Sequence, residues 1–116
     1  MLCGDVLLMK TIASPSFSVR VHIAGDIDVA RQWLRRECVR EGLCVTLKAE
    51  EFIYTNGMEA GVEIGLENYP RFPKTADEIL ARSVIIAEGL MSELCQSSAM
   101  IVTPTETIWK TTRDEK

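Results

Sequence analysis

A turn dipeptide between two alternating apolar segments constrains this chain more than any other feature. Asn56-Gly57 is a pair that type I′ hairpin turns favour, because both central residues of such a turn need positive φ. Apolar and polar residues alternate over residues 43–49 before the turn and 58–66 after it. This period of two predicts a pair of antiparallel strands joined by a tight turn.

The same turn predicts the register of the hairpin. With two central residues at 56 and 57, Ile53 lies opposite Ala60 and faces the core. Phe52 lies on the other face, opposite Gly61, where an aromatic ring can cover the bare backbone.

Capping residues mark two helices. Asp26 stands where a side chain accepts the first free backbone N–H groups, and Gly42 is placed to end that helix in a left-handed conformation. Thr75 and Glu78 have the spacing of a capping box, which predicts the start of a second helix.

Two further strands complete a βαββαβ order. Residues 17–24 alternate, and residues 99–110 form the last predicted strand, with Pro104 at a sheet edge because proline donates no ladder hydrogen bond. This order predicts an α+β, ferredoxin-like domain: a four-stranded antiparallel sheet of order 4-1-3-2 with two helices on one face.

The domain is expected to cover residues 12–112. Residues 1–11 are interpreted as an N-terminal extension, and Met9 is an alternative start to Met1. Residues 113–116 are interpreted as a loose tail.

Charge and hydropathy narrow the classes of partner. A formal net charge of −4 gives no general attraction to nucleic acid or to anionic membranes. No apolar run approaches the roughly 20 residues that span a bilayer, and the N-terminus lacks the basic region of a signal peptide. We therefore expect a cytoplasmic protein with neither nucleic acid nor membrane as partner.

The cysteines do not form a metal-binding pattern. The chain has four cysteines without a Cys-x-x-Cys pair, and a single histidine. A structural zinc site needs about four placed ligands, so we expect no metal, no cofactor and reduced, mostly buried thiols.

The open face of the predicted sheet offers candidate binding residues. They are polar or aromatic side chains that alternate with the apolar positions: Arg20, His22, Lys48, Phe52 and Glu63. Three glutamates on the third strand, at 59, 63 and 67, argue against an RNA-binding platform. Neighbouring members of that row lie roughly 13 Å apart along the strand, too far to share one cation. A solvated face is the alternative interpretation of all these residues.

A proline-bounded loop is a second candidate contact. Pro70 and Pro73 form a Pro-x-x-Pro pattern that peptide-binding grooves recognise, with Tyr69, Arg71 and Phe72 around it. The alternative is that the prolines stiffen the loop while the aromatic rings close the end of the core.

Several segments resemble known proteins. GDIDVARQW, YTNGMEAG, NYPRFP and CQSSAMIVTPTETIW are similar to segments of small uncharacterised proteins encoded by bacteriophages or prophages. The resemblance covers residues 17–110. It implies a phage context without a mechanism.

These observations predict a non-catalytic protein-interaction module, a phage accessory factor that forms a homodimer. Ile86 and Leu90 exceed a single apolar stripe on the second helix. Either these two residues, or Met100 and Val102 on the edge strand, would lie partly in water without a second copy to cover them. Two alternatives stay open: a small-molecule-binding regulatory domain, and a small dimeric αβ-barrel-type enzyme with Arg20 and His22 at its centre.

Overall fold

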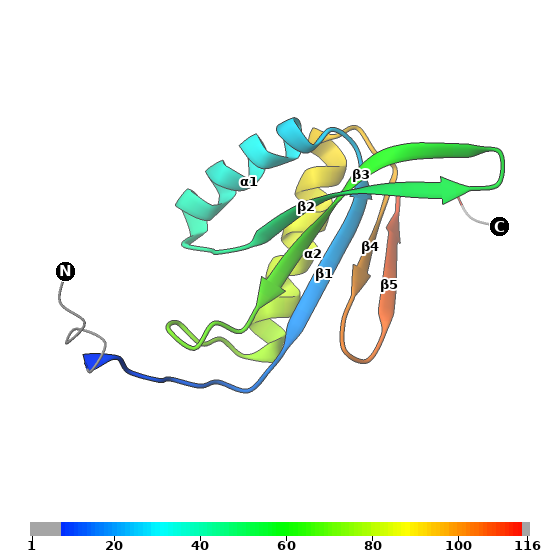
Figure 1. Ribbon diagram of the computed structural model, residues 1–116. Helices are drawn as coiled ribbons and strands as arrows, with labels where there is room; N and C mark the ends of the chain where they lie inside the picture. The colour runs from blue at the N-terminus through cyan, green and yellow to red at the C-terminus, as the bar shows by residue number, and fades with distance from the viewer. Residues whose placement is uncertain (1–7, 115–116) are drawn as a thin grey trace.

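A computed structural model of the protein describes residues 8–114. Residues 1–7, with Cys3 and most of the predicted extension, and residues 115–116 of the predicted tail lie outside the described part. One antiparallel sheet of order β2-β3-β1-β4-β5 carries two helices. The elements in chain order are β1 (Ser18–Ala24), α1 (Ile27–Glu41), β2 (Thr46–Tyr54), β3 (Gly57–Glu67), α2 (Ala76–Glu93), β4 (Ser98–Val102) and β5 (Thr107–Thr111) (Figure 1).

The sheet has five strands where four were predicted. Residues 99–110 do not form one strand, because a tight connection at Thr103–Glu106 folds the chain back and leaves Pro104 between β4 and β5. Thr103 closes this connection: its N–H donates to the Glu106 carbonyl at 2.9 Å, and its hydroxyl accepts from the Glu106 N–H at 3.0 Å. The α+β class is confirmed, and the four-stranded ferredoxin-like arrangement is corrected by the added edge strand β5.

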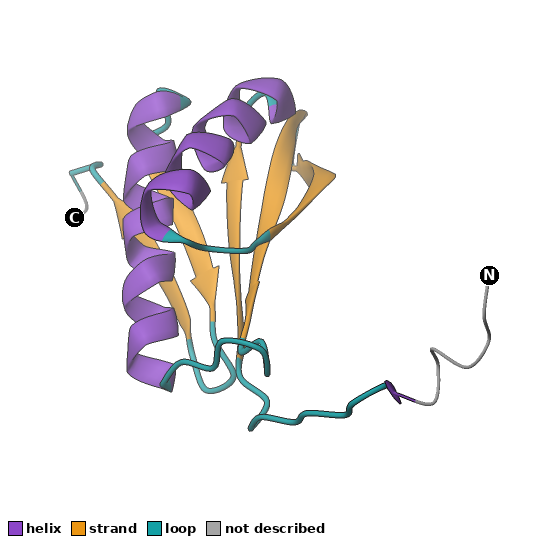
Figure 2. Ribbon diagram, turned by 90° about the vertical axis from the view of Figure 1, so that its left-hand side faces the viewer, coloured by secondary structure: helices purple, strands orange, loops and turns teal. Residues whose placement is uncertain are grey.

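Both helices cover the same face of the sheet (Figure 2). The predicted caps are confirmed: the Asp26 carboxylate accepts from the Asp28 N–H at 2.7 Å, and Gly42 ends α1 at φ 67°. Thr75 and Glu78 form the reciprocal capping box. That hydrogen bonding lowers the pKa of the Glu78 carboxyl.

The core lies between this face and the helices. Ile86 and Leu90 are fully buried in it, so the prediction that they lie partly in water is wrong, and these two residues give no reason for a second copy. The other fully buried large apolar side chains come from the three central strands: Val19, Val21, Ile23, Val62, Ile64 and Ile101.

The hairpin register differs from the prediction by two residues. Tyr54 pairs with Gly57 and Ile53 with Met58, so the turn residues are Thr55 and Asn56. Only one of the two needs the left-handed region, since Asn56 has φ 68°. A shift of two keeps every side chain on its predicted face, because side chains alternate with a period of two.

The far end of the β2–β3 hairpin extends beyond the helical layer (Figure 1). Ile53 is 78% exposed there, although it faces the same side as the core. Phe52 pairs with Glu59 rather than with Gly61, yet its ring lies against the Gly61 backbone as expected. The far end of the hairpin therefore borders the open face of the sheet with Phe52 and Tyr54.

The thiols are less buried than predicted. Cys38 is partly buried, while Cys44 and Cys95 are exposed. Cys44 lies in the connection before β2, and Cys95 follows α2 with φ 55°. Neither position is inside the layer between the helices and the sheet. Among residues 8–114, no helix has the length and apolar character needed to cross a membrane.

Candidate functional site: a groove on the open face of the sheet

The open face of the sheet brings one side chain from each strand into a row. His22 of β1 pairs with Glu63 of β3 on one side and with Met100 of β4 on the other. Lys48 of β2 pairs with Glu63, and Trp109 of β5 pairs with Met100. Directly paired residues share a face, so the row runs across the whole sheet opposite the helices.

A groove of about 340 Å³ lies along one side of this row. Three aromatic side chains line it: Phe52 and Tyr54 from the hairpin, and Trp109 from the edge strand β5. Trp109 is 49% exposed, so a large part of its surface is free to contact a ligand. The remaining lining residues are His22, Ile23, Ala24, Glu59, Gln96, Ser98, Ala99, Met100 and Arg113.

Two groups of opposite charge also line the groove. Glu59 comes from β3, and Arg113 follows the last strand. The Arg113 side chain is oriented by a hydrogen bond from its Nε to the Ser97 hydroxyl at 2.9 Å. The groove thus offers aromatic surface, one carboxylate and one guanidinium to a ligand, which is the composition of a small-molecule site.

A half-buried polar cluster adjoins the groove at His22. The His22 Nδ1 lies 2.8 Å from a Glu50 carboxylate oxygen, and the Lys48 Nζ lies 3.3 Å from Glu63. Ligand atoms of His22, Glu50 and Glu63 all lie within 4.8 Å of one another. These contacts join three strands, so spacing along one strand did not predict them.

The predicted open-face residues are only partly brought together. His22 and Phe52 line the groove, whereas Lys48 and Glu63 form the adjacent ion pair. Arg20 is exposed on the same face, paired with Gly65 and Val102, and does not line the groove.

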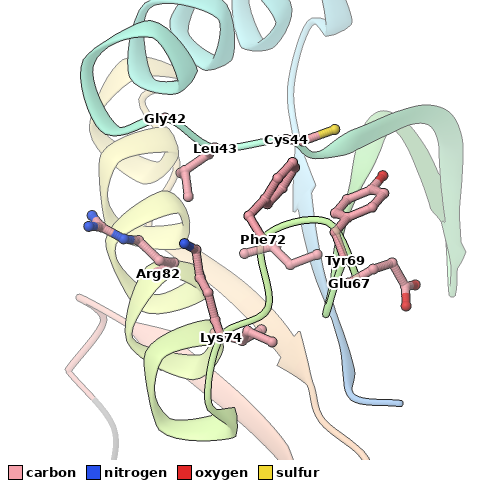
Figure 3. A pocket seen from close by; sticks show the side chains of 10 residues that line it. Gly42, Leu43, Cys44, Glu67, Tyr69, Phe72, Lys74 and Arg82 are labelled. Carbon is pink, nitrogen blue, oxygen red and sulfur yellow. The ribbon is translucent and has the colours of Figure 1, made fainter. Parts of the chain in front are cut away.

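The predicted loop residues lie in another part of the molecule. Tyr69 and Phe72 line a small hollow between the loop, the start of α2 and the connection after α1 (Figure 3). Arg71 is exposed and does not line it. The two rings lie 5.5 Å apart between centroids. The hollow measures about 20 Å³, which is room for about one water molecule. It is too small for a substrate.

Two titratable groups at or beside this hollow, Tyr69 and Cys38, have raised pKa values. A hydrogen bond with the Cys44 thiol raises the pKa of Tyr69. Burial raises the pKa of Cys38. Both shifts favour the protonated form, which is the less reactive one.

Sequence reasoning missed most of the groove. Met100 and Trp109 were not recognised because residues 99–110 were interpreted as one strand, and Arg113 because it was assigned to a loose tail. The signal that could have found them is the Thr-Pro-Thr-Glu segment at 103–106, which is typical of a turn.

Comparisons with known proteins bear on what the groove holds. No protein-family model matches the chain, and no curated protein is significantly similar to it. Two solved structures are similar: a phage SAM lyase in complex with S-methyl-5′-thioadenosine, with a TM-score of 0.71, and a phage SAM lyase in the apo state, with a TM-score of 0.70. Each is 14% identical to the chain, and each alignment covers 93% of this chain and 98% of the other.

This likeness corrects the functional prediction. Both neighbours are enzymes with a small-molecule substrate, so the prediction of a non-catalytic interaction module is wrong, and the alternatives of a small-molecule binder or enzyme are better supported. That both are phage proteins agrees with the phage resemblance of the sequence. At 14% identity the likeness itself establishes the shared fold.

Proposed function

We propose that the protein is an enzyme that cleaves S-adenosylmethionine, and that it binds this substrate in the groove on the open face. The observation that carries the proposal is a groove with aromatic side chains, a carboxylate and a guanidinium, on a fold shared almost end to end with a SAM lyase.

The lining of the groove matches the parts of this substrate. An adenine ring stacks on an aromatic side chain, and Phe52, Tyr54 and Trp109 offer three. The sulfonium is a cation that aromatic faces and the Glu59 carboxylate attract. The substrate carboxylate can form a bidentate pair with the Arg113 guanidinium.

The reaction needs no reagent beyond the substrate. The bond between sulfur and the four-carbon amino-acid chain breaks, and its electron pair stays on sulfur, which leaves as the neutral thioether S-methyl-5′-thioadenosine. The four-carbon fragment closes on its own carboxylate or loses a proton from the neighbouring carbon. Either route is lyase chemistry, whereas hydrolysis would add water to this fragment.

Chromatography with mass spectrometry tests the proposal. Purified protein incubated with S-adenosylmethionine should release S-methyl-5′-thioadenosine and a four-carbon product. The mass of the four-carbon product should show that it has not incorporated a water molecule. Trp109→Ala should lower the rate, and Glu67→Gln, on the same face but outside the groove, should not.

Two results would count against cleavage in this groove. If the Trp109→Ala protein is as active as the unsubstituted protein, the reaction takes place outside this groove. Binding of S-adenosylmethionine without any product would favour the regulatory-domain alternative.

Self-association is a further expectation. Since Ile86 and Leu90 are used in the core, we infer that a second copy would contact the exposed part of the hairpin, where Ile53, Tyr54 and Met58 are open to solvent. Light scattering coupled to size exclusion measures this directly. A mass near 13.0 kDa at high concentration would exclude the homodimer.

A further inference from the structure

Three potential metal ligands converge on the open face from three neighbouring strands. His22 and Glu63 are direct partners on β1 and β3. Glu50 of β2 pairs with Gly61, which has no side chain, and Glu50 reaches across β3 to His22. Its two carboxylate oxygens lie 2.8 and 3.1 Å from the His22 Nδ1. The ligand atoms of all three residues lie within 4.8 Å of one another.

The burial and charge of the cluster favour a cation. The side chains of His22, Glu50 and Glu63 are 16%, 23% and 15% exposed. Two carboxylates held this close in a partly desolvated place repel each other unless a positive charge lies between them. Lys48 supplies one charge, but its side chain is 69% exposed and makes its contact with Glu63 at 3.3 Å.

We propose that His22, Glu50 and Glu63 bind a divalent first-row transition metal such as Mn²⁺ or Zn²⁺. Metal–ligand bonds to imidazole and carboxylate are about 2.0–2.2 Å long, so bound ligand atoms lie roughly 3–3.6 Å apart. Rotation of the two flexible glutamate side chains closes the cluster from its present spread. The metal takes the place of the direct contact between the His22 Nδ1 and the Glu50 carboxylate, and Lys48 moves to solvent.

The donor set decides the class of metal. One imidazole with two carboxylates suits Mn²⁺, Fe²⁺, Co²⁺ or Zn²⁺, whereas Mg²⁺ and Ca²⁺ prefer oxygen ligands alone. Three protein ligands leave positions for water, as in sites that are open to solvent. The expectation of no metal, drawn from cysteine spacing and from one row of glutamates, did not consider ligands from three strands together.

Removal of Lys48 should have opposite effects in an ion-pair network and in a metal site, so it distinguishes the two. An ordinary ion-pair network loses a favourable partner when the lysine is removed. A metal site loses a competing cation instead, so its affinity for metal rises. The proposal does not depend on the cleavage of S-adenosylmethionine.

Mn²⁺ binding measured by electron paramagnetic resonance is the test, because the free ion gives the signal and exposed thiols are poor ligands for it. His22→Ala and Glu50→Gln should each weaken Mn²⁺ binding by about tenfold or more, at least the effect of losing a partner that only orients a ligand. Lys48→Met should strengthen it. Glu67→Gln, the same change on the same face of β3, is the matched control and should leave it unaltered.

Zn²⁺ should displace Mn²⁺ from the same site in competition. Circular dichroism of each variant shows whether it is folded, and Lys48→Met alone tests the proposal if His22→Ala does not fold. Full Mn²⁺ affinity in a folded His22→Ala protein, or weaker binding in Lys48→Met, would overturn the proposal. All these measurements omit S-adenosylmethionine, so their failure is distinct from a failure of the proposed enzymatic function.

Discussion

The two faces of the sheet are made by the same strands, but one face is apolar and buried while the other carries charged and polar side chains. On the face covered by helices, Val21, Ile64 and Ile101 are fully buried, and their contribution is the burial and close packing of apolar side chains. On the open face, their neighbours His22, Glu63 and Met100 lie in one row, where charge and shape decide the contacts. The covered face holds the fold together, and the open face is free to carry chemistry.

This division predicts opposite results for substitutions one residue apart on β3. Ile64→Ala should lower the free energy of unfolding by about 2–5 kcal/mol, because it removes buried methyl groups and leaves a cavity. Glu63→Gln should change it far less, since Glu63 is held by a single exposed lysine. Urea denaturation of both variants gives the comparison. Equal losses would mean that the open face also stabilises the fold.

A substitution of Trp109 tests whether the open face binds the proposed substrate. Trp109→Ala should weaken binding of S-adenosylmethionine by about 1–3 kcal/mol, the range for a base stacked on an aromatic side chain. Thermal stability should change little, since the ring is 49% exposed. Calorimetric titration with the substrate, alongside a thermal melt, separates the two effects. A large loss of stability with unchanged binding would make Trp109 a structural residue.

The sequence predicted the covered face better than the open one, for a physical reason. Capping at Asp26 and Thr75 and the alternation along each strand are local patterns, and they place each side chain on a face without knowledge of its partner. The groove depends on which residues lie opposite each other across strands. That information enters through the turn at Pro104 and the order of the strands, and the missed turn at Pro104 removed Trp109 from the predicted site.

The hairpin turn places Asn56 in the left-handed region of φ. Asn56→Val should lower the free energy of unfolding by about 1 kcal/mol or more, because a β-branched residue is strained at φ 68°. Asn56→Gly should be tolerated, since glycine adopts this region readily. Thermal melts of the two variants measure the difference.

Gly57 does not have positive φ, although the predicted turn required it there, so a substitution at Gly57 should carry no penalty of that origin. A side chain there would instead meet the Tyr54 ring, 2.7 Å from the position of an added Cβ. Equal stability of Asn56→Val and Asn56→Gly would contradict the observed turn.

The smallest expected effect concerns the charge of the groove. S-adenosylmethionine carries a sulfonium cation, whereas S-adenosylhomocysteine has the same adenosine and amino-acid parts around a neutral sulfur. Glu59 is exposed at the groove, so its attraction for the cation is screened by water, and exposed ion pairs contribute up to about 1 kcal/mol.

Glu59→Gln keeps the shape of the side chain and removes its charge. It should weaken S-adenosylmethionine binding by a few-fold and leave S-adenosylhomocysteine binding nearly unchanged, with Glu67→Gln as the control on the same strand. Competition titrations of both ligands at low and moderate salt measure this, and the difference between the ligands should shrink as salt rises. An equal loss for both ligands would show that Glu59 contributes a contact rather than a charge.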